Sequence, residues 1–303
     1  MNKRVITIVI IFAAAIFPAF AQKARPKKTA QPKPIIFAVI NDGAMIEPIA
    51  YIENKKLTAP VDGGAENSEI KAFNGTYYRP KASYRLIFGG SDDGTAAVKS
   101  ADAGVECAAN MAQIAASPQK AKLKGMVMAL ATNAPAGKKG SGVRRRPTAD
   151  ERSQIETLVR SEFEKQKIPA DRTKTLRYHN LTALDVDSDG TAELVGSYWV
   201  ETDPKSRALL FFIADKAKDG KYVFGYSEFE KIDEENVMSG EIAALDTGIY
   251  HELLLDIFDY DGDGVSEIFT YSPSFEGAGF NAYRRESGKW VRSFEGSNYH
   301  CGF

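Results

Sequence analysis

Short apolar runs separated by turn residues recur along most of the chain, and this pattern predicts a protein built mainly from β-strands. Residues 35–40 (IIFAVI) are apolar throughout, which is typical of a strand buried on both faces. Further runs in the first half of the chain are rich in strand-forming residues, namely 46–57, 76–80, 83–90, 95–100 and 124–132. They predict an N-terminal β domain over residues 35–132, folded as a small sandwich or barrel. The acidic segment SDDG, Ser91–Gly94, lies between two of these runs, and we interpret it as a hairpin turn.

One segment has helical periodicity. Thr148 and Glu151 have the spacing of a capping box, in which each side chain accepts a hydrogen bond from a free amide of the first turn. Behind them Ile155, Leu158, Val159 and Phe163 fall on one face of a helix. We expect this helix to cover one face of a sheet.

Two β-hairpins are expected nearer the C-terminus, with their turns at Asp219–Gly220 and Ser287–Gly288. The strand runs that flank these turns are 208–214 with 222–229, and 280–284 with 290–294. Residues 148–303 are therefore predicted to be a second β-rich domain with one helix at its start. The expected fold class is mainly β (α+β).

The beginning of the chain has the pattern of a secretory signal peptide over residues 1–21. Lys3 and Arg4 precede an apolar run, and Ala19–Phe20–Ala21 provides a small-x-small cleavage site. A retained membrane anchor is the alternative, but the run is shorter than the roughly 20 residues of a transmembrane helix. We therefore expect an exported protein, periplasmic or extracellular, whose mature chain has no membrane span.

Two segments are predicted to be linkers. Residues 22–34 are basic and proline-rich and predict a solvated tether, and residues 133–147 are rich in glycine and basic residues. In the second linker we expect Arg144–Arg146 to remain hydrated. Binding to an anionic surface or proteolytic processing at the arginine run are the functional alternatives.

Charge and cysteine content narrow the choice of partners and compartment. The net charge is −1 with 26% charged residues, which argues against a nucleic-acid or membrane-surface partner. Cys107 and Cys301 are the only cysteines. In an oxidising compartment they could form a disulfide, and two separate thiols are the other possibility.

An acidic pattern occurs twice, as DVDSDGTAE at 185–193 and DYDGDGVSE at 259–267. Two like charges 4 Å apart repel by about 1 kcal/mol in water and by about 4 kcal/mol at an effective dielectric constant of 20. Several carboxylates in one tight loop therefore favour a bound cation over a plain acidic turn. Calcium, which takes six to eight oxygen ligands, suits such a loop.

The spacing also indicates which residues would bind the ion. In a loop wound around an ion the first, third and fifth side chains point inward, and the glycine at position six allows a sharp turn. The seventh residue offers its carbonyl, and the ninth, a glutamate, completes the shell. The predicted ligands are Asp185, Asp187, Asp189, Thr191 and Glu193 in the first loop and Asp259, Asp261, Asp263, Val265 and Glu267 in the second.

The flanking residues distinguish this pattern from an EF-hand, which needs a glutamate at position twelve and helices on both sides. Position twelve is Gly196 in one loop and Thr270 in the other, and both exit segments favour strands. The pattern instead resembles the calcium loops of FG-GAP or VCBS-type repeats, known from integrin-like β-propellers and many secreted bacterial proteins. The resemblance implies two calcium sites at the positions given above. Two repeats cannot close a propeller of four to eight blades, so a full propeller is not expected.

No catalytic motif is evident. His179, His251 and His300 are the only histidines, and none is paired at metal-ligand spacing. We therefore expect a non-enzymatic, exported calcium-binding module with structural ions and an unidentified protein or glycan partner. The alternative is a secreted hydrolase with a site between the two domains, for which His179 and His251 are the candidate residues.

Overall fold

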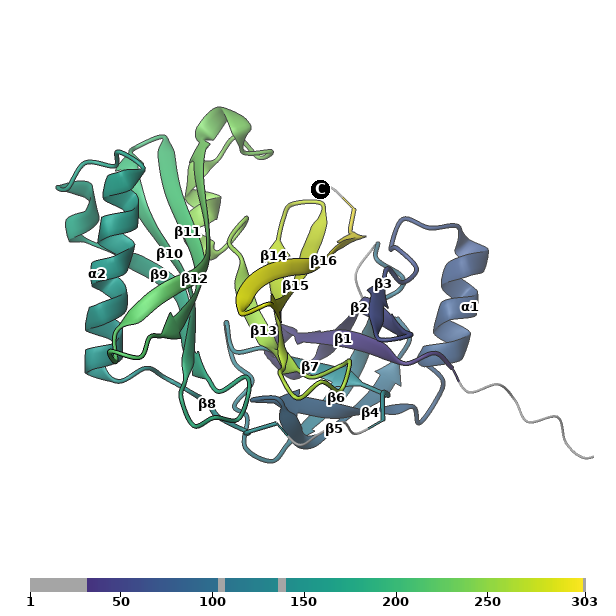
Figure 1. The fold of residues 1–303 in the computed structure, drawn as a ribbon. Helices are drawn as coiled ribbons and strands as arrows, with labels where there is room; N and C mark the ends of the chain where they lie inside the picture. Colours follow the sequence, from purple (N-terminus) through teal and green to yellow (C-terminus); the bar gives the residue numbers. More distant parts are fainter. Residues whose placement is uncertain (1–31, 103–106, 136–139, 302–303) are drawn as a thin grey trace, which may run out of the picture. The chain divides into compact units, whose positions relative to one another are not determined.

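The computed structural model describes residues 32–102, 107–135 and 140–301, which form a mainly β protein and no propeller (Figure 1). This confirms the predicted fold class. The signal peptide predicted at 1–21 and residues 22–31 of the tether lie outside the described residues. Among the described residues no helix is both long and apolar enough to cross a membrane.

The described elements comprise sixteen strands and two α-helices. In chain order they are β1 (Ile35–Ile40), β2 (Met45–Glu53), β3 (Lys56–Thr58), α1 (Asn67–Tyr77), β4 (Ser83–Phe88), β5 (Ser91–Ser100), β6 (Ala112–Pro118), β7 (Ala129–Thr132), β8 (Arg144–Arg145), α2 (Ala149–Lys165), β9 (Arg177–Leu184), β10 (Glu193–Asp203), β11 (Ser206–Lys216), β12 (Tyr222–Asp233), β13 (Leu253–Phe258), β14 (Glu267–Pro273), β15 (Gly277–Glu286) and β16 (Lys289–Tyr299).

The first sheet closes into a six-stranded barrel. Its strands follow the order β1-β7-β4-β5-β6-β2, and β2 pairs back onto β1, while β3 is added beside β2. Phe37 and Val39 from one face of β1 pack in the barrel core, and Ile36 and Ala38 from the other face belong to a separate cluster. Both faces of β1 are therefore buried, as its continuous apolar run predicts.

A helix replaces one of the strands predicted in this region. The expected strand at 76–80 is wrong, because α1 continues through Tyr77. Ile70, Phe73 and Tyr77 lie at helical spacing and form its buried face. Aromatic residues that suggest a strand when taken alone are here one side of a helix that packs on the barrel.

The turn predicted at Ser91–Gly94 is also displaced. The chain reverses at Gly89 and Gly90, whose φ angles of +62° and +71° favour glycine, and β5 begins at Ser91. Asp93 is buried because its carboxylate accepts hydrogen bonds from the amides of Lys120 and Ala121, at 2.9 and 2.8 Å. The Asp93 carboxylate therefore stabilises a contact within the barrel and does not form a turn.

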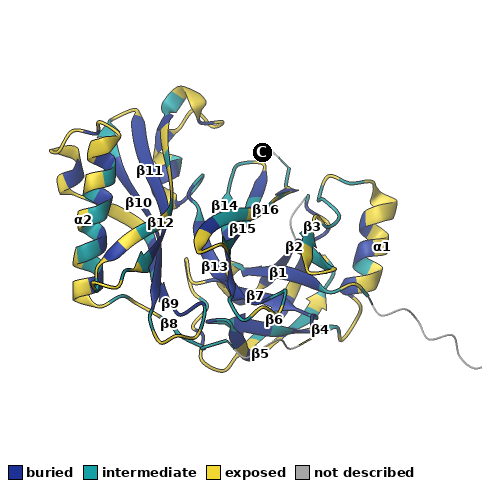
Figure 2. Ribbon diagram, viewed as in Figure 1, coloured by how far each residue is buried: buried dark blue, intermediate teal, exposed yellow. Residues whose placement is uncertain are grey.

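The second sheet has the order β12-β11-β10-β9-β8, and α2 covers one of its faces (Figure 1). The capping box is present, since Thr148 accepts from the amide of Glu151, and Glu151 accepts from the amide of Thr148. Ile155, Val159 and Phe163 pack against the sheet, as predicted. As Figure 2 shows, β10 and β11 are buried along most of their length.

The third sheet, β13-β14-β15-β16, packs on both of the others. Leu253 and Leu255 of β13 face the cluster that contains Ile36 and Ala38 of the barrel. Leu254, on the opposite side of the same strand, joins a cluster with residues of the second sheet. Every residue of β13 is therefore buried.

The segment predicted as the second linker contains a buried arginine. The Arg144 side chain is only 6% exposed, and the guanidinium Nη1 donates to the carbonyls of Met128 and Leu255 and to Asp256 Oδ2, at 2.9, 2.6 and 2.9 Å. The expectation that Arg144 is hydrated is therefore wrong. The cause is Asp256, a fully buried carboxylate that needs a positive partner. The linker boundaries stay a prediction.

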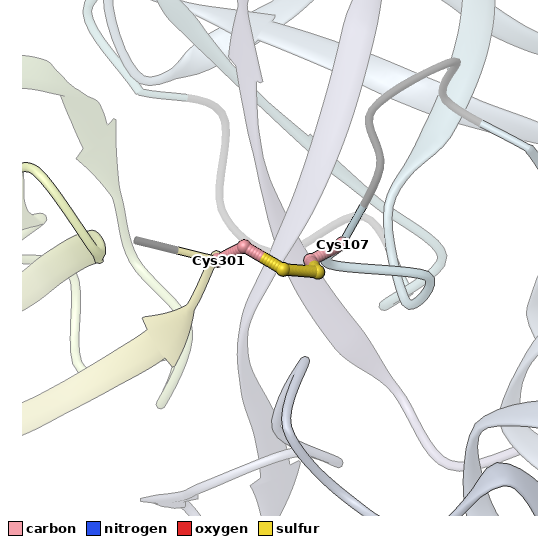
Figure 3. Close-up of a disulfide and its surroundings, with 2 residues drawn as sticks. All are labelled: Cys107 and Cys301. Atoms are coloured by element: carbon pink, nitrogen blue, oxygen red, sulfur yellow. A yellow bond between two sulfur atoms is a disulfide. The ribbon is translucent and has the colours of Figure 1, made fainter. Parts of the chain in front are cut away.

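A disulfide joins Cys107 to Cys301, which decides between the two possibilities that the sequence leaves open (Figure 3). The Cα atoms are 5.2 Å apart, within the usual range for disulfides. Close by, the side chain of Asn298 accepts from the Asn110 side-chain amide at 2.7 Å and donates to Glu47 at 2.8 Å. The end of β16 is thus held to the barrel by covalent and polar contacts.

Candidate functional site

The first acidic loop connects the antiparallel strands β9 and β10. One carboxylate oxygen from each of Asp185, Asp187 and Asp189 lies within 4.8 Å of the others. Burial decreases along the loop: Asp185 is buried, Asp187 is half-buried and Asp189 is exposed. The predicted first, third and fifth positions therefore come together at the end of a hairpin.

Backbone hydrogen bonds shape this loop. The amide of Gly190 donates to Asp185 Oδ2 at 3.3 Å, and that of Thr191 donates to Asp189 Oδ1 at 2.6 Å. Gly190 has a φ of +84°, a conformation that a side chain would disfavour. The sixth-position glycine thus has the role predicted from the sequence.

The second loop, between β13 and β14, repeats this arrangement. Asp259, Asp261 and Asp263 again have carboxylate oxygens within 4.8 Å of one another. The amide of Gly264, with a φ of +100°, donates to Asp259 Oδ2 at 3.0 Å, and the amide of Val265 donates to Asp263 Oδ1 at 2.8 Å. Two segments far apart in the chain therefore share these bonds, and the second loop has one more, from the amide of Gly262 to Asp259 Oδ1 at 2.7 Å.

The ninth-position glutamates lie at the first residue of each exit strand and are buried. Glu193 Oε2 accepts from the amide of Val186 at 3.1 Å, and Glu267 Oε2 accepts from the amide of Tyr260 at 3.3 Å. These bonds tie the end of each loop back to its beginning. The clusters of closely spaced carboxylates consist of the aspartates, so the ligand roles of Glu193 and Glu267, and of the carbonyls of Thr191 and Val265, stay predictions.

One oxygen in the first loop has no protein partner. Asp185 is 6% exposed, and its Oδ1 is buried without a hydrogen-bond partner among the described residues. Leaving a buried carboxylate oxygen unpartnered is costly. A cation between the three aspartates would satisfy it, so the donor set fits a hard, oxygen-seeking ion.

The two loops differ in electrostatic compensation. Arg285 on β15 reaches the first loop, where its guanidinium contacts Asp187 Oδ2 at 2.8 Å and Glu193 Oε1 at 2.9 Å. It also pairs with Asp215 and lies over the Trp290 ring, 4.9 Å from the centroid. Among the described residues no ion pair is formed by the carboxylates of the second loop. Arg285 cannot be recognised as a partner from the sequence, because it is 98 residues from Asp187.

The pKa values of the two glutamates follow this difference. Burial, followed by the charge of Asp261, raises the pKa of Glu267 to about 9. Burial raises the pKa of Glu193 only to about 7, since the Val186 amide and Arg285 stabilise its charged form. The neutral form of the carboxyl group is therefore favoured more strongly at Glu267 than at Glu193.

The loops also touch each other. The amide of Ser266 in the second loop donates to the carbonyl of Val186 in the first, at 2.7 Å. Val186 and Val265 belong to the hydrophobic cluster between the second and third sheets. An ion in either loop would therefore act on the packing between these sheets.

Neither His179 nor His251 belongs to the two aspartate triads, and His300 pairs with Glu47 at 2.7 Å. The rings of His179 and His251 meet edge-on with centroids 4.4 Å apart, a contact that their separation in the chain conceals. His251 and Ser197 line a cleft of about 580 Å³ that also contains Glu252. Ser197 Oγ is 3.4 Å from His251 Nδ1. All residues that line this cleft come from the second and third sheets and the segment that joins them.

The protein is mainly β. Each of two β-hairpin loops carries a triad of aspartates that could hold a metal ion. Comparison with known proteins gave no matching family model, no matching curated protein and no matching solved structure.

Proposed function

We propose that the protein is an exported calcium-binding β module in which two structural ions stabilise the hairpin loops β9–β10 and β13–β14. The observation that carries this proposal is the repetition of one geometry: three aspartates within 4.8 Å, and the same amide-to-carboxylate bonds in both loops. The buried, unpartnered Oδ1 of Asp185 supports a cation there.

Three considerations favour calcium as the ion. Its preference for six to eight oxygen ligands matches loops that offer carboxylates and carbonyls. The resemblance to FG-GAP or VCBS-type loops points to the same ion. The Cys107–Cys301 disulfide supports an oxidising compartment outside the cytoplasm, where calcium sites of about 10⁻⁴–10⁻³ M affinity are useful.

The ions would act through stability. An ion that binds only the folded state stabilises it by RT ln(1 + [L]/Kd), about 2.7 kcal/mol at a hundredfold excess over Kd. Because the loops lie where the second and third sheets meet, this energy would hold the sheets in place for an unidentified protein or glycan partner. No catalytic role is assigned to the ions.

Substituting the central aspartate of each loop tests the ligand assignment. We expect Asp187→Ala and Asp261→Ala each to lower the number of bound calcium ions by one and to reduce the calcium-dependent rise in melting temperature. Native mass spectrometry and thermal melting with calcium or a chelator measure these effects. Asp219→Ala, at a hairpin turn without an aspartate triad, is the matched control. Both loop variants keeping the wild-type ion count would refute the assignment.

Arg285 gives the two sites different expected affinities. Its positive charge contacts two of the predicted ligands of the first loop, so calcium must compete with it there. Arg285→Gln should therefore tighten calcium binding at the first loop by roughly tenfold, about 1.4 kcal/mol, and leave the second loop unchanged. Calcium titration of the variant in an Asp261→Ala background isolates the first site. Lys289→Gln removes the same charge from an exposed position at the start of β16 and should have no effect.

A second candidate function is a secreted hydrolase that uses the cleft containing Ser197, His251 and Glu252. The Ser197–His251 contact favours it. Two features oppose it: burial and the neighbouring His179 lower the pKa of His251 to about 3, and His251 Nε2 has no hydrogen-bond partner among the described residues. A general base works best with a pKa near the operating pH, and in a catalytic triad its second nitrogen is bound by a carboxylate. Turnover of a hydrolase substrate that His251→Ala abolishes would establish this alternative.

A further inference from the structure

A second cleft, of about 420 Å³, has no role in the proposed calcium function. It is lined in part by Arg144, Arg145, Arg146, Arg152, Tyr178 and Asn180, and we refer to it as the basic cleft. None of its lining residues is an aspartate or a glutamate. It lies along β8 and β9 beside the first turn of α2, and none of its lining residues belongs to either acidic loop.

Two of the four arginines are neutralised by the protein. Arg144 pairs with Asp256 at 2.9 Å, and Arg145 pairs in a bidentate manner with Glu151, at 2.7 and 2.8 Å. Arg146 and Arg152 form no ion pair with a carboxylate among the described residues, and the guanidinium of Arg152 lies 5.0 Å from the centre of the Tyr178 ring. The cleft therefore presents two uncompensated positive charges in a chain whose net charge is −1.

A buried amide provides an independent indication of a ligand. Asn180 on β9 is 9% exposed, and both its Oδ1 and its Nδ2 are buried without a hydrogen-bond partner among the described residues. Buried amide groups are nearly always bonded, so each of these atoms calls for a partner. A hydroxyl group, which both donates and accepts, can satisfy either atom.

We propose that the basic cleft binds a small hydroxylated organic anion of about monosaccharide size. Its carboxylate or phosphate pairs with Arg146 and Arg152, and a hydroxyl group bonds to Asn180. Phe88 and the partly exposed Met126 supply apolar contacts for the carbon skeleton. The cleft volume lies in the lower part of the range for small-molecule sites, roughly 300–1,000 Å³. The proposal does not depend on the calcium sites.

Isothermal titration of the calcium-saturated full chain tests the proposal with three probes. D-glucuronate and D-glucose 6-phosphate carry the two anionic groups on a hydroxylated ring, and D-glucose carries no charge. At least one anion should bind about tenfold or more tighter than glucose, because charge-assisted hydrogen bonds are stronger than neutral ones. The two anionic arms decide between carboxylate and phosphate. Absence of anion binding, or equal binding of glucose, would overturn the proposal.

Two variants locate the binding. Arg146→Ser/Arg152→Ser should weaken the anion about tenfold or more, whereas Lys165→Ser/Lys174→Ser, which removes two exposed charges outside the cleft, should not. Unchanged binding in the first double variant would contradict the site. Calcium stoichiometry measured on the same samples separates a failure here from a failure of the calcium sites.

Asn180→Leu distinguishes a ligand contact from a structural role. Because the amide has no protein partner, an apolar side chain of similar size should keep or raise the melting temperature of the free protein. The same variant should lose anion affinity. Retained affinity, or a large fall in melting temperature, would show that Asn180 does not serve the ligand.

Discussion

Replacing Asp256 with alanine should lower the free energy of unfolding by about 3–5 kcal/mol, the usual cost of breaking a buried ion pair. Asp256 is fully buried on β13, and its partner Arg144 is 6% exposed, so the variant leaves a desolvated guanidinium without a counter-charge. The amide of Gly89 also loses its acceptor, at present 2.9 Å away. The barrel, the segment before α2 and the third sheet meet at this carboxylate.

Urea unfolding at constant calcium concentration measures this effect. Glu234→Ala is the control, because its pair with Lys205 is exposed and should be worth at most about 1 kcal/mol. The second prediction for the pair concerns Arg144→Met. It should cost less than Asp256→Ala, since Asp256 keeps the amides of Gly89 and Ile257. A loss for Asp256→Ala no larger than the control would show that Arg144 and Asp256 are not paired inside the folded protein.

The Arg144–Asp256 pair also shows a limit of prediction from the sequence alone. Period and composition were enough for β1 and the buried face of α2, because each of these elements is set by neighbours within a few residues. From the sequence alone Arg144 is predicted to be hydrated, because its partner Asp256 is 112 residues away. Whether a charge is buried depends on tertiary contacts that no local pattern contains.

The two incorrect predictions in the barrel region, the strand at 76–80 and the turn at 91–94, have a related cause. Tyr77 and its neighbours satisfy both a helical and a strand pattern over so short a stretch, and packing against Phe37 and Tyr84 decides in favour of the helix. Asp93 looks like a turn residue until the amides of Lys120 and Ala121 are brought to it. In both cases tertiary contacts override local preference.

The residues of the candidate sites also differ in how far the sequence predicts them. The three aspartates of each triad lie within five residues of the sequence, so their spacing and the glycine at position six predict that they come together. Arg285 could not be found in this manner, because Asp187, which it contacts, is 98 residues away. Asn180 could not be found either, because its lack of a hydrogen-bond partner depends on the tertiary structure. Their roles follow from which polar atoms the fold compensates and which it leaves without a partner.

Breaking the Cys107–Cys301 disulfide is the other change with a large expected effect. The bond closes a loop with a sequence separation of 194 residues, and restricting the unfolded chain over such a loop is worth up to about 5 kcal/mol in the chain-entropy account. The folded state should change little. The reason is that Asn298 still bonds to Asn110 and Glu47 and so holds the end of β16 on the barrel. The loss should therefore arise mainly from the greater freedom of the unfolded chain.

The measurement compares urea unfolding of the wild type, with and without a thiol reductant, with that of Cys107→Ser/Cys301→Ser. The reduced wild type and the double variant should share a lower midpoint, and the reductant should not affect the double variant. Calcium stoichiometry should stay the same in all samples, because neither cysteine lies near an acidic loop in the chain. A wild type that unfolds at the same midpoint in both conditions, with two titratable thiols from the start, would mean that the cysteines are not joined. The support that the disulfide gives to an oxidising compartment would then be lost, whereas the calcium proposal would still rest on the loops themselves.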